Sequence, residues 1–190
     1  KGTLFGVNIC EDTWFHYAPE CAQAAGAQVL LVLNASPFHL GKQAQRLQTM
    51  RANVSHFGLP LVYANLTGGQ DELVFDGASF VLAADGALVA MAPYFDEAVL
   101  VVEFVDGVPQ PASIVTEPPL ETLAYQALVL GVRDYVGKNG FPGALIGLSG
   151  GVDSALTLAI AVDALGADRV RAVMMPSQFT SPMSVEDAEQ

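Results

Sequence analysis

The stretch Gly-Leu-Ser-Gly-Gly-Val-Asp-Ser at residues 147–154 constrains the fold more than any other part of the sequence. It follows the apolar run 144–146 and precedes the apolar segment 155–160, which predicts a strand, a tight loop and a helix. Two adjacent glycines allow the backbone to approach an anion closely. Serine hydroxyls and the N–H groups of the first helical turn add donors at the positive end of the helix dipole. We therefore expect a polyphosphate-binding loop within an α/β fold.

Two other interpretations of this loop fit its residues less well. A Walker A loop would end in Gly-Lys-Ser or Gly-Lys-Thr, whereas no lysine follows Lys138, so a P-loop NTPase is excluded. An ordinary Gly-rich turn would require neither Asp153 nor Ser154. The pattern Ser-Gly-Gly-x-Asp-Ser instead resembles the pyrophosphate loop of the N-type ATP pyrophosphatases. Those enzymes cleave ATP to AMP and pyrophosphate while they activate an acceptor as its adenylate.

That resemblance implies two cofactors, ATP and Mg²⁺. The residues that it places around ATP are Gly147, Leu148, Ser149, Gly150, Gly151, Val152, Asp153 and Ser154. Asp153 is the candidate Mg²⁺ ligand because a hard cation binds carboxylate and phosphate oxygens. The helix dipole would also favour an acid at this position, and the two roles are compatible. Met175 and Pro176, after the next predicted strand, are expected near the adenosine.

The composition excludes several classes of partner. The formal net charge is −12 with only eight lysines and arginines, which argues against a nucleic-acid surface because such surfaces are basic. The apolar runs are far shorter than the roughly eighteen residues that a membrane span requires. The two cysteines, Cys10 and Cys21, provide no disulfide framework, as is usual in a reducing compartment. We expect a cytoplasmic protein with no nucleic-acid or membrane partner.

Hydrophobic periodicity divides the chain into two α/β segments joined by a proline-rich linker. The first segment is predicted to contain strands at 4–9, 28–33, 61–65 and 97–104, helices at 19–26 and 42–57, and a hairpin over 78–83 and 88–91. The second is predicted to contain a helix at 120–138 and then a βαβ unit at 143–148, 153–165 and 169–175. Helix 153–165 is apolar nearly all round and should be buried. We place domains at 1–107 and 120–190, with the linker at 108–119.

A second constellation surrounds Cys10, which follows the first predicted strand and precedes Glu11 and Asp12. A buried core cysteine is the ordinary interpretation of such a residue. A cysteine on a sharp turn after a strand, however, is exposed at the sheet edge, where a base and backbone donors can reach a reacting carbonyl. The two acids could line a pocket or could simply be turn residues, and the sequence does not separate these roles.

The segment 6–12 resembles the nucleophile elbow of the nitrilase superfamily, whose triad is Glu, Lys and Cys. Segments 34–39 and 68–77 match the branch of that superfamily that acts as a glutaminase. A nitrilase-like glutaminase, a linker and an ATP pyrophosphatase loop, in that order, resemble the glutamine-dependent NAD⁺ synthetase family over essentially the whole chain. The implied fold is part of an αββα sandwich followed by the first βαβ unit of a parallel sheet.

The resemblance also implies an activity and site residues. Cys10 would be the glutaminase nucleophile, while Ser36 and Lys42 would contact L-glutamine. ATP would adenylate deamido-NAD⁺, and ammonia would then displace AMP to give NAD⁺. Residues 68–77 are a candidate for the glutaminase end of an ammonia channel, and the family usually forms homo-oligomers.

The sequence departs from the family pattern at both ends. The family's triad glutamate and lysine lie well upstream of the cysteine, and only nine residues precede Cys10 here. The later substrate-binding residues of the synthetase lie beyond residue 190. We therefore expect a fragment that is inactive alone. Two alternatives remain: another ATP pyrophosphatase-type amidotransferase, such as a GMP or asparagine synthetase relative, whose families use other glutaminase folds, or a non-catalytic nucleotide-binding remnant.

Overall fold

The computed structural model describes residues 2–189, which form two compact units. One unit comprises the residues up to 68 together with 74–123. The other comprises residues 69–73 together with those from 124 onward. Among residues 2–189, none of the helices combines the length and the hydropathy that a membrane span needs.

The first unit is built on a five-stranded mixed sheet in the order β1-β2-β3-β6-β7. Its strands are β1 (Phe5–Ile9), β2 (Val29–Asn34), β3 (Leu61–Asn65), β6 (Phe80–Leu82) and β7 (Leu88–Met91). The first three are parallel, and β6 and β7 are antiparallel to their neighbours, so the predicted hairpin is confirmed. Two crossovers connect the parallel strands: η1 (Cys10–Trp14) with α1 (Tyr17–Ala24), and α2 (Lys42–Phe57).

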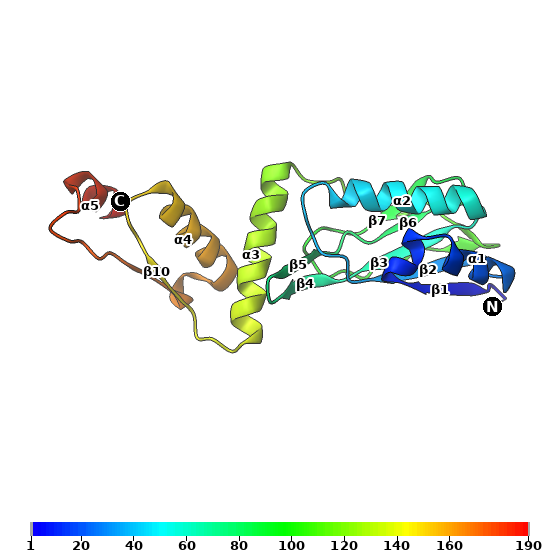
Figure 1. Cartoon of the computed structure of the whole chain (residues 1–190), viewed down its shortest axis with the longest axis horizontal. Helices are drawn as coiled ribbons and strands as arrows, with labels where there is room; N and C mark the ends of the chain where they lie inside the picture. The colour runs from blue at the N-terminus through cyan, green and yellow to red at the C-terminus, as the bar shows by residue number, and fades with distance from the viewer. Residues whose placement is uncertain (1, 190) are drawn as a thin grey trace. The chain divides into compact units, whose positions relative to one another are not determined.

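Helix α2 covers one face of this sheet (Figure 1) and spans the residues predicted for it. Gly58 ends the helix because its φ of 64° lies in the left-handed region. Its N–H still donates to the Val54 carbonyl at 2.8 Å. The helix buries Met50, Val54 and Phe57 in the core. In β1, by contrast, every second side chain is an exposed apolar one. Phe5, Val7 and Ile9 are 49%, 59% and 63% exposed. This apolar face is of the kind that a second sheet covers in a sandwich.

The prediction of a strand at 97–104 is wrong. Only Phe104–Val105 (β8) is a strand, and it pairs with Val108–Pro109 (β9) across a tight turn at Asp106 and Gly107, where φ is 50° and 79°. Val99 and Val101 are 95% and 82% exposed. Their alternation resembles that of a strand, but no neighbouring strand accepts hydrogen bonds from this segment in the described structure.

Part of the proline-rich segment is ordered against the sheet. The Met91 N–H donates to the Ser113 carbonyl at 2.9 Å, and the Val115 N–H donates to the Met91 carbonyl at 3.1 Å. Residues 113–115 therefore extend alongside β7 within the first unit, and prolines on both sides limit the pairing to this short stretch.

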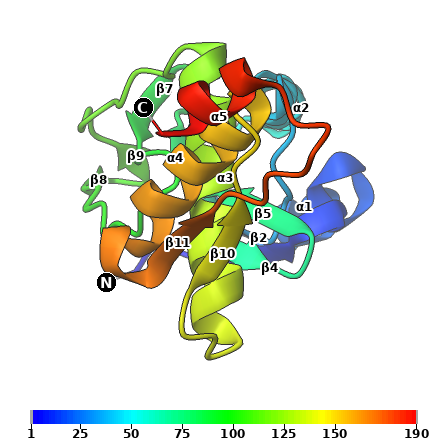
Figure 2. The same ribbon diagram turned by 90° about the vertical axis from the view of Figure 1, so that its left-hand side faces the viewer.

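The second unit contains the predicted βαβ arrangement. Its elements are α3 (Leu120–Lys138, which begins in the first unit), β10 (Ala144–Gly147), α4 (Val152–Leu165), η2 (Ala167–Arg169), β11 (Val170–Val173) and α5 (Pro182–Glu189). Strands β10 and β11 are parallel and adjacent, with α4 beside them (Figure 2). A small cluster of Val136, Ala164 and Leu165 forms the core.

The expectation that α4 is buried all round is wrong. Only Ile160, Ala161, Ala164 and Leu165 are buried. The side chains of Val152 and Leu156, in the first half of the helix, are 79% and 50% exposed. The described sheet of this unit has two strands, so it covers only the C-terminal half of the helix.

Candidate functional site

Cys10 lies on a strained turn at the end of β1. Its φ is +48°, in the left-handed region that favours glycine, and such a conformation costs a non-glycine residue about 1–2 kcal/mol. The side chain is half-buried. A sharp turn directly after the strand was predicted, and the backbone has one. Strain of this kind persists where the surrounding structure holds the residue in place.

Three side-chain contacts hold this turn. The Asp12 carboxylate accepts the Ile9 N–H at 2.8 Å, which caps the first turn of η1. The Thr13 hydroxyl donates to the Cys10 carbonyl at 3.1 Å. The Asn53 amide of α2 donates to the Thr13 carbonyl. Asp12 thus has a structural role in the turn, which settles part of the question that the sequence left open.

The role of Asp12 leads to a stability prediction. Asp12→Ala should lower the free energy of unfolding of the chain by about 1 kcal/mol, the usual cost of losing a helix cap. Glu11→Ala is the matched control, because among residues 2–189 the Glu11 carboxylate makes no hydrogen bond or ion pair. Urea unfolding followed by circular dichroism would measure both variants. Equal destabilisation by the two substitutions would contradict the capping role.

Strand register brings the polar residues after β1, β2 and β3 to one edge of the sheet. Ile9 is opposite Leu33, and Asn34 is opposite Asn65. The carboxyl ends of parallel strands share an edge, which is where ligands bind in such sheets. Cys10 and the residues that follow Asn34 therefore lie at the same edge.

Ser36 is held at this edge by a buried ion pair. Its hydroxyl accepts from Arg46 Nε at 3.1 Å, and its N–H donates to Asn65 Oδ1 at 2.9 Å. Arg46 Nη1 in turn contacts Asp76 Oδ2 at 2.8 Å, and both side chains are almost completely inaccessible to solvent, at 0% and 1% exposure. Ser36 is itself buried, so its position depends on the interior of the unit.

Lys42, the other residue predicted to contact glutamine, lies next to the turn that begins at Cys10. Its ammonium is 4.7 Å from the centroid of the Trp14 ring, a cation–π arrangement. The same ammonium donates to Gln45 Oε1 at 3.1 Å. Trp14 is the last residue of η1, so this contact links the start of α2 to the cysteine turn.

Tyr63 adds a buried hydroxyl near these groups. The side chain is 1% exposed, and its ring stacks on the Phe80 ring at a centroid distance of 4.7 Å. Burial raises the pKa of Tyr63, although the nearby Arg46 guanidinium and Ser36 hydroxyl act to lower it. The phenol is therefore neutral at physiological pH.

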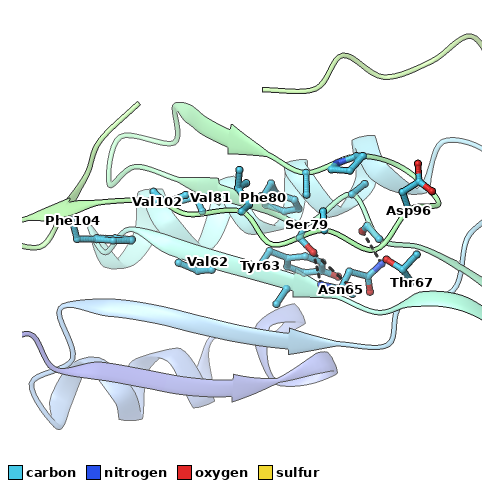
Figure 3. Close-up of a pocket in the computed structure, with 17 residues that line it drawn as sticks. Val62, Tyr63, Asn65, Thr67, Ser79, Phe80, Val81, Asp96, Val102 and Phe104 are labelled. Carbon is cyan, nitrogen blue, oxygen red and sulfur yellow. Dashed lines mark hydrogen bonds between the residues drawn. The ribbon is translucent and has the colours of Figure 1, made fainter. Parts of the chain in front are cut away.

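A cavity of about 340 Å³ in the same unit shares Tyr63 and Asn65 with this group of residues (Figure 3). Its lining comes from β3, β6 and the irregular segment that precedes β8, and includes Val62, Ser79, Val102 and Phe104. Cys10, Ser36 and Lys42 are not among its lining residues. The candidate glutamine residues thus form an edge of the sheet and not this cavity.

The predicted phosphate loop joins β10 to α4 in the second unit. Ser149 and Ser154 are linked through their hydroxyls at 3.0 Å, and Ser154 also donates to the Gly151 carbonyl at 2.9 Å. Gly150 has a φ of +80°, and a Cβ there would lie 2.3 Å from the Ser184 carbonyl oxygen of α5. The other glycine of the pair, Gly151, is the N-cap residue of α4. Gly150 is therefore required both by conformation and by the close approach of α5.

The donors and the acid of this loop suit a polyphosphate with its cation. The first N–H groups of α4 follow Gly151 at the positive end of a fourteen-residue helix. Asp153, in the first turn, is exposed, and its carboxylate has no protein hydrogen bond within the described residues. No group of three or more metal-binding side chains occurs among residues 2–189. A single carboxylate fits Mg²⁺, which is commonly held by one or two carboxylates together with substrate phosphates.

A cavity of about 520 Å³ adjoins the loop within the second unit. Its walls include Gly147 and Ser149 from the loop, Met175 and Pro176 after β11, and Ser184 of α5. The residues expected near the adenosine thus lie in one cavity with the start of the phosphate loop.

Residues 69–73, the tip of the hairpin formed by β4 (Thr67–Gln70) and β5 (Leu73–Asp76), belong to the second unit. The Gly69 N–H donates to Asp134 Oδ2 at 2.7 Å, and the Lys138 ammonium donates to the Gly69 carbonyl. A Cβ on Gly69 would approach the Asp134 Cβ to 3.1 Å. The tip is therefore packed tightly on α3.

This contact predicts a pH-dependent contribution to stability. Burial acts to raise the pKa of Asp134, but the Gly69 N–H, Lys138 and Arg133 together outweigh it and hold the pKa below its ordinary value of 3.8. The contribution of the Asp134 carboxylate to the free energy of unfolding is then complete above about pH 4. It is lost as pH falls through the folded-state pKa. Asp134→Asn should lower the free energy of unfolding by about 1 kcal/mol at pH 7. The difference from the parent chain should shrink on acidification.

Urea unfolding of both chains at pH 7 and below pH 3 would measure this effect. Asp168→Asn, which changes an exposed acid of the same unit, is the control and should have little effect at either pH. A penalty for Asp134→Asn that stays constant as pH falls would contradict the prediction.

Several residues around the candidate sites were missed by sequence reasoning. These are Trp14, Arg46, Asn65, Tyr63 and Asp76. Asp76 lies inside the segment 68–77 that matches glutaminases, and Arg46 lies in the basic helix 42–57, but nothing in the sequence indicated that these two would pair. A salt bridge between residues thirty positions apart has no local signal.

Two family models match separate parts of the chain, and relatives match nearly all of it. A model described as carbon–nitrogen hydrolase matches residues 1–108, and one described as NAD synthase matches residues 124–190. Similar proteins include the glutamine-dependent NAD(+) synthetase of Acinetobacter baylyi, 48% identical over 98% of this chain, and that of Rhodobacter capsulatus, 48% identical over 96%. The chain spans 35% and 34% of the lengths of these two relatives.

A solved structure has the same fold over nearly the whole chain. It is that of glutamine-dependent NAD⁺ synthetase from Acinetobacter baumannii in complex with adenosine diphosphate. The TM-score is 0.91 at 46% sequence identity, and the match covers 97% of this chain and 36% of that one.

Proposed function

Because this chain belongs to the carbon–nitrogen hydrolase family and its homologues are glutamine-dependent NAD⁺ synthetases, we propose that it is part of an enzyme that makes NAD⁺ with nitrogen from glutamine. One observation carries the proposal. A single chain joins a strained cysteine turn at the carboxyl ends of parallel strands to a Ser-Gly-Gly-x-Asp-Ser loop at a helix N-terminus.

In the proposed glutaminase half, Cys10 attacks the side-chain amide carbon of L-glutamine. The C–N bond breaks, ammonia leaves, and water then hydrolyses the γ-glutamyl thioester to release glutamate and restore the thiol. The sharp turn supports this role because it places Cys10 directly after β1, in the first turn of η1, where N–H groups without a partner inside the helix would serve an oxyanion. Ser36 and Lys42 would hold the glutamine, with the Lys42 ammonium facing its α-carboxylate.

In the proposed synthetase half, the loop would bind ATP by its phosphates. The N–H groups of the first turn of α4 and the hydroxyls of Ser149 and Ser154 supply donors without adding charge. Asp153 would hold Mg²⁺, which would neutralise the phosphates as the carboxylate of deamido-NAD⁺ attacks the α-phosphorus and pyrophosphate leaves. Ammonia then displaces AMP from the adenylate. The cavity beside Met175 and Pro176 would receive the adenosine.

The remaining partners and boundaries are also proposals. The substrates are L-glutamine, ATP and deamido-NAD⁺, the enzyme is cytoplasmic, and it forms homo-oligomers. The glutaminase domain would end near residue 107 and the synthetase domain begin near residue 120. Residues 68–77 would line the glutaminase end of an ammonia channel.

The test supplies the full-length protein with ATP, Mg²⁺ and deamido-NAD⁺, and with either glutamine or ammonium as the nitrogen source. NAD⁺, AMP and pyrophosphate should form in equal amounts with both sources, whereas omission of deamido-NAD⁺ should prevent NAD⁺ formation. Formation of AMP with xanthosine monophosphate or aspartate, and not with deamido-NAD⁺, would favour another amidotransferase. No turnover of any acceptor would favour a non-catalytic nucleotide-binding protein.

A further inference from the structure

Arg46 has every one of its donors engaged inside the first unit. Nε donates to Ser36 Oγ at 3.1 Å, Nη1 to Gln43 Oε1 at 3.1 Å and to Asp76 Oδ2 at 2.8 Å, and Nη2 to the carbonyls of Ser36 and Pro37 at 2.7 and 3.2 Å. A guanidinium has five N–H groups, so none is left over. Three of the five bonds end on two consecutive residues of the loop after β2.

Farther along this loop, the Phe38 N–H donates to the Val74 carbonyl at 2.7 Å, but Ser36 and Pro37 depend on side chains. Ser36 and Pro37 lie outside any helix or strand, so their backbone polar groups need partners from elsewhere. Asn65 supplies the rest, because its Oδ1 accepts the Ser36 N–H at 2.9 Å and its Nδ2 donates to the Gly77 carbonyl at 3.1 Å. Arg46 and Asn65 therefore determine together where the Ser36 hydroxyl lies.

The bond from Arg46 also orients that hydroxyl. Because Ser36 Oγ accepts from Nε, its own proton must point away from the guanidinium. Ser36 can then donate either to the neighbouring Tyr63 hydroxyl or to a ligand. A lysine at position 46 could keep the charge pair with Asp76, but a single ammonium could not make the forked set of bonds to Ser36 and Pro37.

Stability alone is a weak reason for burying such a pair. Desolvation of two charges offsets much of their attraction, and apolar pairs of similar volume are often as stable. We propose that Arg46, held by Asp76, is a positioning residue that sets Ser36 and its loop in the geometry that binds the amino-acid substrate at Cys10. This inference rests on the proposed glutaminase function.

The test compares Arg46→Lys with the parent protein at full length. The KM for glutamine should rise by about tenfold or more, the loss expected when charge-assisted hydrogen bonds to the loop are removed, while ammonia-dependent NAD⁺ formation is unchanged. In Arg46→Lys, a glutamine-analogue electrophile should alkylate Cys10 more slowly than in the parent protein. The rate of alkylation by iodoacetamide should be unchanged. Asp76→Asn, a second variant, should shift both readouts in the same direction.

Arg51→Lys is the matched control, because Arg51 lies on the same helix, is exposed and makes one bond, from Nε to the Gly86 carbonyl. It should leave the KM and both alkylation rates unchanged. A normal KM in Arg46→Lys, or an equal fall in both alkylation rates, would show a purely structural role and overturn the inference. If the parent protein neither hydrolyses glutamine nor reacts with the analogue faster than with iodoacetamide, the proposed function fails and the inference with it.

Discussion

Cys10→Ala in the full-length protein should reduce glutamine-dependent NAD⁺ formation by at least about 1,000-fold, because the proposed thioester forms on the Cys10 sulfur. Ammonia-dependent formation should be unchanged, since the synthetase half receives ammonia directly. The comparison is made by measuring NAD⁺ with glutamine and with ammonium at equal ATP and deamido-NAD⁺. It tests the role of Cys10 and the independence of the two halves at once.

Cys21→Ala is the control for this experiment. Cys21 is the other cysteine of the chain and is exposed on α1, so its removal should affect neither nitrogen source. Loss of both activities in Cys10→Ala would contradict the proposed separation of the halves. Retained glutamine-dependent turnover would exclude Cys10 as the nucleophile.

Gly150→Ala should reduce NAD⁺ formation by about 100-fold or more with either nitrogen source. The new Cβ would lie 2.3 Å from the Ser184 carbonyl oxygen and 3.0 Å from the Ser184 Cα, at a φ of +80° that alanine rarely adopts. These atoms are backbone atoms and cannot move aside alone, so the loop or α5 must shift. A displacement of about 1 Å in a positioning element can cost about 100-fold in rate.

Glutamine hydrolysis measured as glutamate release distinguishes this effect from unfolding, because Gly150→Ala should retain the hydrolysis that Cys10→Ala loses. Gly137→Ala is the matched control. A Cβ at Gly137 in α3 meets nothing within 4 Å, and alanine should stabilise the helix by about 1 kcal/mol. Full activity of Gly150→Ala would mean that the loop does not hold the phosphates as proposed.

Features set by neighbouring residues could be predicted from the sequence. Helix α2 begins at Lys42 and ends at Phe57 as predicted, because Gly58 stops it in the left-handed conformation. The βαβ arrangement around residues 147–154 was predicted from one apolar run, one glycine-rich loop and a second apolar run. The sharp turn at Cys10 was also predicted, from a strand followed by two acids.

Where a feature depends on residues far away in the sequence, the prediction missed it or was wrong. The segment 97–103 has strand-like alternation, but a strand also needs a neighbour to accept its hydrogen bonds, and the described structure gives it none. Helix α4 is apolar nearly all round, yet its first half is largely exposed because the described sheet of the second unit is only two strands wide. Periodicity indicates which residues could be buried, and the packing elements decide which are.

The loop at residues 147–154 shows the division clearly. The sequence by itself determined that a strand leads into a glycine-rich turn and a helix, because conformational preference and helix-dipole effects act over a few residues. Only the tertiary structure decided that Gly150 meets Ser184 of α5 and that Ser36 is held by Arg46 and Asp76. Contacts between residues far apart in the chain arise when separate elements pack, and packing depends on the three-dimensional fit of whole elements, which leaves no short-range pattern in the sequence.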